Sequence, residues 1–272
     1  MSGGWLSGLR KTLGAGATAA PDQTAVAPGA SWLFGASHIG ALRRAQQERI
    51  AKGRGPAAIR NMKIASLGAS RVSKAPFHRV RQGRVGVLDV GYQRNFDTSG
   101  IGGAIAPGDR VGVQMGDGNG ILLDHGSYWA SHAPAALCEK GTISVPQTTL
   151  EAICDAESAP VRAFMKDLQN LGFRLYWVPY PPIKEDHPMF ANGVRPEVIT
   201  ALDTLFLTRM TAAMTAMGIP VVPRPAAGTT AKGLLPQEFS QTETGTGTVD
   251  WVHANPAYGD LMLDEVDRKS VV

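Results

Sequence analysis

Apolar and polar positions along the chain form short apolar runs, which predict strands, and periodic segments, which predict helices. The first run is SWLFG at residues 31–35, and it ends in a glycine, as is typical of a buried strand. From Ile39 to Ile50 apolar residues recur at helical spacing, and Gly53 is a helix stop signal. The sequence therefore predicts that Ser37 lies where a strand turns into a helix.

Several further runs have the composition of strands. Residues 173–182 (FRLYWVPYPP) are rich in aromatic and β-branched residues, which favours a central strand, and the two prolines at its end stop it. The sequence of residues 84–92 also indicates extended structure, and we expect these residues to form part of a hairpin that packs on the domain. The remaining strands are expected at 62–68, 110–116 and 218–223.

Helical periodicity marks three more segments. The first covers residues 148–171, in which Pro160 favours a break. The second covers residues 196–217, and the last begins near Pro256, since proline is favoured at the first helical position. The Gly- and Thr-rich stretch 224–249 is expected to be a loop.

This order of strands and helices predicts a parallel sheet with helices on both faces. In such folds a site lies at the carboxyl ends of the strands. Three strands that end in glycine deliver Ser37, Gly68 and the loop 116–120 to that edge. The location of the site therefore follows from the pattern alone, before any motif is considered.

The chain has 272 residues, 43% hydrophobic and 18% charged, which favours one globular α/β domain. We expect that domain at residues 29–272, after a flexible arm at residues 1–28 that is rich in Gly, Ala, Thr and Pro. No stretch approaches the roughly 20 apolar residues of a membrane span. The basic pair Arg10–Lys11 comes too late for a signal peptide, so a cytoplasmic enzyme is expected.

The net charge is only +4, but the basic residues are unevenly distributed. Between Arg43 and Arg94 there are 13 Lys or Arg residues and only two acids, Glu48 and Asp89. The favoured interpretation is a solvated basic face. The alternative is a landing surface for an anionic substrate, a phosphorylated ligand or nucleic acid, but no nucleic-acid-binding motif accompanies the charge.

The sequence offers no metal or cofactor motif. Cys138 and Cys154 form no CxxC pair and have no histidines at zinc-finger spacing, so we expect two reduced, structural thiols. The glycines of TSGIGGAIAPG do not follow a strand and open a helix, as a dinucleotide fingerprint requires. We therefore expect neither a metal nor a cofactor.

Ser37 is the first candidate for chemistry. A serine at a strand-to-helix turn can expose its hydroxyl above the sheet edge, and its free backbone N–H can bind an oxyanion. A helix N-cap is the alternative role, because serine is preferred there. On this feature alone the N-cap is the favoured interpretation.

Asp250 and His253 change that balance. They lie three residues apart, just before the helix that Pro256 opens. One turn can bring the carboxylate against Nδ1–H of the imidazole, which fixes the tautomer and leaves Nε2 free as a base. An isolated D-x-x-H pattern favours a surface turn, but here it follows an α/β chain whose first strand presents a serine.

Together these blocks resemble the signature blocks of the SGNH (GDSL-like) hydrolase superfamily. GASH, at residues 35–38, is similar to the first block, and DWVH, at 250–253, to the last. GDGNG, at 116–120, is similar to the third block, in which Asn119 matches the asparagine that binds the oxyanion. Gly68 matches the single glycine of the second block, with Gly91 as an alternative.

The chain departs from the family pattern at several positions. The first block has Ala36 where Asp is commoner, and His38 where Leu is commoner. The third block has Asp117 two places before Asn119 and Gly120 just after it, where the usual form has Gly and Asp. These departures bear on the third block most, because neither Ala36 nor His38 would carry the proton chemistry.

The resemblance implies a three-layer, flavodoxin-like α/β sandwich of the SGNH-hydrolase type with a central parallel sheet. It also implies a serine esterase, with Ser37, Asp250 and His253 as a triad and an acyl-enzyme on the serine. The N–H groups of Ser37 and Gly68 and the Asn119 amide would form the oxyanion hole.

The resemblance leaves the substrate open. A small or carbohydrate ester is expected, and an O-acyltransferase or a non-catalytic module that binds a glycan or a partner are the alternatives. The oligomeric state is also open. The residues that we expect to line the substrate site are His38, Asp117, His125, Tyr128 and Trp129. For His38, packing at the helix start is the alternative and is slightly favoured. For His125, Tyr128 and Trp129, a solvated loop is an equally favoured alternative.

Overall fold

The computed structural model of the chain describes residues 29–69, 73–98, 105–116, 118 and 120–270. The arm expected at residues 1–28 lies outside the described residues, so its flexibility stays a prediction. Within the described part of the chain, no helix is both long enough and apolar enough to cross a membrane.

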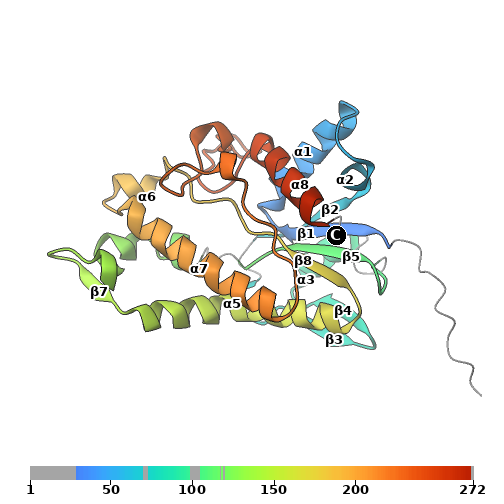
Figure 1. Ribbon diagram of the computed structural model, residues 1–272, viewed down its shortest axis with the longest axis horizontal. Coiled ribbons are helices and arrows are strands. Elements are labelled where there is room, and N and C mark those ends of the chain that lie inside the picture. The colour runs from blue at the N-terminus through green and yellow to red at the C-terminus, as the bar shows by residue number, and fades with distance from the viewer. Residues whose placement is uncertain (1–28, 70–72, 99–104, 117, 119, 271–272) are drawn as a thin grey trace, which may run out of the picture.

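A parallel sheet of four strands lies at the centre of the fold (Figure 1). The strands are β1 (Ser31–Ala36), β2 (Lys63–Gly68), β5 (Arg110–Gln114) and β8 (Arg174–Trp177), in the spatial order β2-β1-β5-β8. Residues 218–223, predicted as a strand, contribute only a single parallel bridge between Trp177 and Val221, beside β8. With that bridge the order is that of flavodoxin-like folds, which confirms the predicted fold class.

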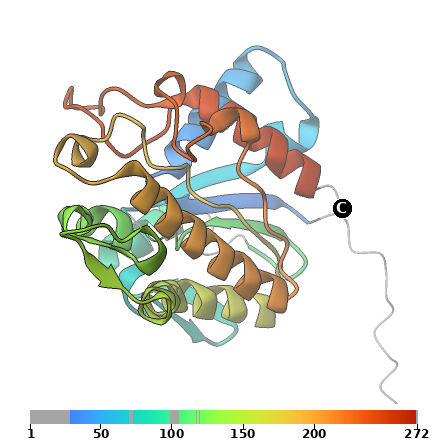
Figure 2. The same cartoon turned by 60° about the vertical axis from the view of Figure 1, so that its left-hand side comes forward.

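Helices cover both faces of this sheet (Figure 2). In β1, Phe34 faces one layer and Leu33 the other, because successive side chains of a strand alternate. The layer on the Phe34 side contains α3 (Val90–Thr98), α5 (Gln147–Asn170) and α7 (Pro196–Ala216). The layer on the Leu33 side contains α1 (Ile39–Ala51), α2 (Ala57–Asn61) and α8 (Pro256–Ser270).

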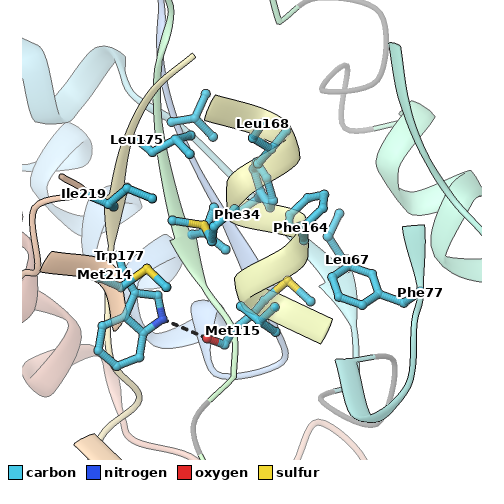
Figure 3. Packing of buried hydrophobic residues seen from close by; sticks show 14 of the residues in the cluster. Phe34, Leu67, Phe77, Met115, Phe164, Leu168, Leu175, Trp177, Met214 and Ile219 are labelled. Atoms are coloured by element: carbon cyan, nitrogen blue, oxygen red, sulfur yellow. Dashed lines mark hydrogen bonds between the residues drawn. The ribbon is translucent and has the colours of Figure 1, made fainter. Parts of the chain in front are cut away.

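The core on the Phe34 side is packed with aromatic rings (Figure 3). The ring of Phe34 lies 6.0 Å from that of Phe164 in α5, centroid to centroid. It lies 6.2 Å from the ring of Phe96 in α3. Trp177 donates its indole N–H to the backbone oxygen of Met115 at 2.8 Å. This bond ties the segment that follows β5 to the end of β8.

On the opposite face, α8 packs directly against α1. A Cβ at Gly259 would lie 2.3 Å from the carbonyl oxygen of Ala41, so only glycine permits this approach. Arg49 of α1, which is buried, bonds to Asp260 at 2.6 Å and to Asp264 at 2.7 Å. These contacts join the helix after the first sequence block to the helix after the last one.

A third group of buried residues lies beyond the carboxyl ends of β5 and β8, on the left in Figure 1. It includes Leu150 at the start of α5 and Leu202 in α7. Short elements complete it: η2 (Gly120–Asp124), η3 (Gly126–Ala130), β6 (His132–Pro134), η4 (Ala135–Leu137), β7 (Ile143–Val145) and α6 (Pro188–Ala191).

The expected hairpin is present, as β3 (His78–Arg81) and β4 (Arg84–Val87). The prediction of an extended segment as far as residue 92 is wrong beyond Val87. Asp89 Oδ1 accepts the backbone N–H groups of Gly91 at 2.8 Å and Tyr92 at 3.1 Å. This capping interaction starts α3 instead.

The predicted break at Pro160 is also wrong, because α5 is continuous from residue 147 to 170. Proline removes one intrahelical hydrogen bond. The following turns bury Val161, Phe164 and Leu168 completely against the sheet, which offsets that loss. The short helices α2, η5 (Ala226–Gly228) and η6 (Gln237–Phe239) were not predicted.

Both cysteines are free thiols, as predicted. Cys138 is exposed, whereas Cys154 is buried in the core. Burial raises the pKa of the Cys154 thiol to about 12. That thiol therefore stays protonated and unreactive at neutral pH.

Candidate active site

Ser37 lies in the turn between β1 and α1 and is half-buried. A Cβ at Gly35 would lie 2.3 Å from the backbone oxygen of Gln114, so a glycine is needed where β1 and β5 approach. The N-cap of α1 is His38, and no side chain caps that helix. The capping role considered for Ser37 is therefore not the one observed.

Asp250 and His253 lie on a loop whose two arms are antiparallel. Isolated bridges join Ser240 to Ala254 and Glu243 to Val249. We call residues 240–254 the C-terminal hairpin. Because it leads directly into α8, the packing of α8 on α1 fixes its position relative to the turn after β1.

The carboxylate of Asp250 organises the turn that it begins. Its Oδ1 accepts the backbone N–H groups of Val252 and His253, both at 2.9 Å. Its Oδ2 lies 2.9 Å from Nδ1 of His253. Burial tends to raise the pKa of Asp250, but these hydrogen bonds and the imidazole outweigh it, and the pKa lies below its usual value.

The other ring nitrogen of His253 faces the serine. Nε2 lies 2.8 Å from Ser37 Oγ, although 216 residues separate the two. With Nδ1 against the Asp250 carboxylate, the neutral ring carries its proton on Nδ1 and presents Nε2 as an acceptor. The structure thus brings Ser37, His253 and Asp250 into one series of hydrogen bonds.

His38 packs at the start of α1, beside the imidazole of His253, which is the slightly favoured of its two expected roles. Its ring is buried, with a centroid 4.8 Å from that of His253 and 4.3 Å from that of Tyr180. Burial, reinforced by the nearby His253, lowers the pKa of His38 to about 3, although Asp250 opposes this. The ring is therefore neutral at physiological pH.

Gly68 ends β2, and its register partner in β1 is Ala36, the residue before Ser37. Its φ is +136°, and a Cβ there would lie 1.9 Å from the ring of Tyr92. The alternative, Gly91, lies inside α3. Of the two glycines, Gly68 is the one at the strand end beside the serine.

Asp117 and Asn119 lie outside the described residues, so their roles stay predictions. The segment that contains them does begin where expected, directly after β5. There, Gly116 and Gly118 have φ of +74° and +71°. A Cβ at Gly118 would lie 2.8 Å from the ring of Phe206, which explains the glycine.

The remaining predicted lining residues divide into buried and exposed ones. Trp129 is buried, and its indole N–H donates to the carbonyl of Ile121 at 2.7 Å. It therefore packs in the interior, and its role at the substrate site stays a prediction. Tyr128 is half exposed and stacks on His132, with ring centroids 3.5 Å apart. His125 is exposed.

Sequence reasoning missed one buried charge and one partly buried charge. Lys184, in the segment after β8, donates to the backbone oxygens of Gln241 and Asp250. Arg224 pairs with Asp203 of α7. Lys184 is the last residue of a buried run and is followed by the exposed Glu185 and Asp186, so the sequence around it is that of an ordinary surface charge and gave no signal.

The described residues contain no cluster of three or more His, Cys, Asp or Glu side chains that could hold a metal ion. What they bring together is an acid, an imidazole and a hydroxyl. That set can relay a proton and activate an oxygen nucleophile.

No protein-family model matches the sequence, and a search of curated proteins gives no match. Solved structures that are similar include a GDSL-like lipase from Bacteroides thetaiotaomicron VPI-5482, with 9% identity, a TM-score of 0.47 and coverage of 89% of this chain and 87% of that one. A phospholipase A1 from Streptomyces albidoflavus NA297 has 13% identity, a TM-score of 0.44 and coverage of 89% and 100%. The OSK domain of Drosophila Oskar has 11% identity, a TM-score of 0.43 and coverage of 87% and 86%.

The first of these structures is named a GDSL-like lipase, and the sequence blocks resemble the family of that name. Likenesses this distant do not establish an activity, because one fold serves many functions. The function of this chain has to be inferred from the geometry of its own site.

Proposed function

We propose that this chain is a serine esterase of the SGNH type, which hydrolyses a carboxylic ester through an acyl-enzyme on Ser37. The observation that carries the proposal is the series of hydrogen bonds from Asp250 through His253 to Ser37 Oγ. Such a series removes the proton of the hydroxyl as it attacks and stabilises the imidazolium that forms.

The reaction has two halves. Ser37 Oγ attacks the carbonyl carbon while Nε2 of His253 takes the hydroxyl proton. The imidazolium then gives this proton to the alcohol oxygen, the C–O bond breaks, and the acyl group stays on the serine. In the second half Nε2 takes a proton from water, the hydroxide adds to the acyl carbon, and the serine leaves with the proton.

The backbone N–H groups of Ser37 and Gly68, with the amide of Asn119, are the proposed donors to the oxyanion. The register of β1 and β2 supports the first two, because Gly68 pairs with the residue before Ser37. Each donor aimed at the developing charge is worth about 3 kcal/mol in the transition state.

The surface around Asp250 supports a small or carbohydrate ester as the substrate. Trp251 and Val249 flank the acid and are 40% and 56% exposed. Exposed apolar side chains beside a reactive group are typical of a binding surface, and the flat indole suits the apolar face of a sugar ring. An O-acetylated carbohydrate is therefore the substrate class that we propose.

Ser37→Ala tests the assignment, with Ser131→Ala, an exposed serine, as the matched control. We expect Ser37→Ala to lower kcat for p-nitrophenyl acetate by about 10⁴-fold or more and to lose labelling by a fluorophosphonate probe. His253→Ala should lose the label as well, while Ser131→Ala keeps both. Unchanged turnover in Ser37→Ala would refute the proposal, and acetyl transfer to an added sugar would indicate a transferase.

A further inference from the structure

Lys184 is a lysine in the interior of the protein. It lies in the segment that leaves β8, and only 2% of its surface is exposed. An isolated bridge to Leu235 holds its backbone. A buried ammonium is unfavourable unless its N–H groups find acceptors, so the partners of Lys184 indicate why this position carries a charge.

The ammonium donates to two backbone oxygens, those of Gln241 and Asp250. These oxygens belong to opposite arms of the C-terminal hairpin. The arms are also joined by backbone bonds from Gln241 to His253 at 2.9 Å and from Asp250 to Thr242 at 3.0 Å. The Lys184 side chain therefore bonds to both arms of the C-terminal hairpin, next to Asp250.

Two nearby carboxylates, including that of Asp250, stabilise the charge of Lys184. Burial lowers the pKa of Lys184, and the carboxylates of Asp250 and Asp186 oppose that shift. Asp250 is thus held at two points. Its carboxylate accepts the N–H groups of its own turn, and its carbonyl accepts the lysine.

We infer that Lys184 is a positioning residue, which clamps the C-terminal hairpin so that Asp250 and His253 face Ser37. Its effect on catalysis rests on the proposed function. Its effect on the hairpin does not, because the clamp is a contact between the core and a loop. Removing the donors should leave the fold intact and loosen the turn that carries the base.

Lys184→Met tests this, since it keeps the length of the side chain and removes the donors. The matched control is Lys232→Met, at an exposed lysine. We expect kcat for p-nitrophenyl acetate, per site titrated with fluorophosphonate, to fall about 10²-fold, with little change in KM. Amide hydrogen exchange in residues 249–254 should accelerate about 10-fold or more, with no change in β1 or β5.

Lys184→Gln retains two N–H donors without the charge, and it should keep more activity than Lys184→Met. It also serves as the test if Lys184→Met does not fold. Wild-type kcat per titrated site together with wild-type exchange in the hairpin would overturn the inference. If the wild-type protein neither hydrolyses esters nor takes the label, the proposed function fails alone, and the exchange measurement still decides the role of Lys184.

Discussion

The Asp250 carboxylate contacts two groups of His253, the ring nitrogen Nδ1 at 2.9 Å and the backbone N–H at 2.9 Å. The same carboxylate therefore fixes the tautomer of the ring and the conformation of the turn that carries it. Most of its hydrogen-bonding capacity is used within four residues of sequence, so this half of the site is a local structure.

Asp250→Asn should preserve the turn from residue 250 to 253 but change the tautomer of the His253 ring. The amide oxygen can still accept the backbone N–H groups, but the NH₂ group facing Nδ1 would force the ring proton onto Nε2, where it blocks uptake of the serine proton. By analogy with triad enzymes, we expect kcat to fall by about 10⁴-fold. Steady-state kinetics with p-nitrophenyl acetate measure this, with the exposed Asp97→Asn as control; a variant within tenfold of wild type would argue against a triad.

His38→Leu should change the pH dependence of stability. The folded protein protonates His38 only near pH 3, whereas the unfolded chain does so near its ordinary pKa of about 6.5. As the pH falls from 6.5 towards 3, the unfolded state therefore binds the extra proton and is favoured. This single group can remove up to about 1.4 kcal/mol of unfolding free energy per pH unit.

Urea denaturation between pH 4 and 7 checks this expectation. The unfolding free energy of the wild type should fall more steeply towards low pH than that of His38→Leu. His125→Leu removes an exposed imidazole and should leave the wild-type slope unchanged. Equal slopes for His38→Leu and the wild type would mean that the buried ring does not stay neutral.

Gly68→Ala should reduce both stability and turnover. Its φ of +136° strains an alanine, and the new Cβ would lie 1.9 Å from the Tyr92 ring. Any shift of the strand end would also move the N–H that we propose as an oxyanion donor, so we expect kcat to fall by about 10²-fold or more. Thermal unfolding and kcat for p-nitrophenyl acetate are the measurements.

Two further variants separate the causes. Gly53 has a φ of +62°, and no atom lies within 4 Å of a Cβ added there. Gly53→Ala therefore shows what a positive φ costs an alanine without a steric clash, about 1 kcal/mol. Adding Tyr92→Ala to Gly68→Ala should restore part of the stability but not the turnover. Full recovery of kcat in that double variant would mean that Gly68 matters only for packing.

The sheet could be predicted from the sequence because each of its four strands is an apolar run with a clear end. The β1–turn–α1 unit was predicted on the same grounds. The errors lie where a local pattern competes with packing. Pro160 should weaken a helix, but its neighbours are buried against the sheet, and Asp89 begins a helix in a segment that reads as extended.

For the site, the sequence could supply residues with local signatures. Asp250 and His253 share one turn, and Ser37 follows a strand, so each was recognisable by itself. Lys184 and the stack of His38 on Tyr180 were not, because their roles depend on contacts between distant segments. No spacing within the sequence encodes such a contact.

Ser37 and His253 are 216 positions apart in the sequence, and this separation has a consequence for biosynthesis. Ser37 leaves the ribosome long before His253 is synthesised. The growing chain therefore carries the Ser37 hydroxyl without the imidazole that would accept its proton. Under the proposed function, Ser37 can become reactive only after α8 has emerged and docked on α1. Under the proposed function, synthesis order alone keeps a nascent chain from hydrolysing esters before the whole domain has folded.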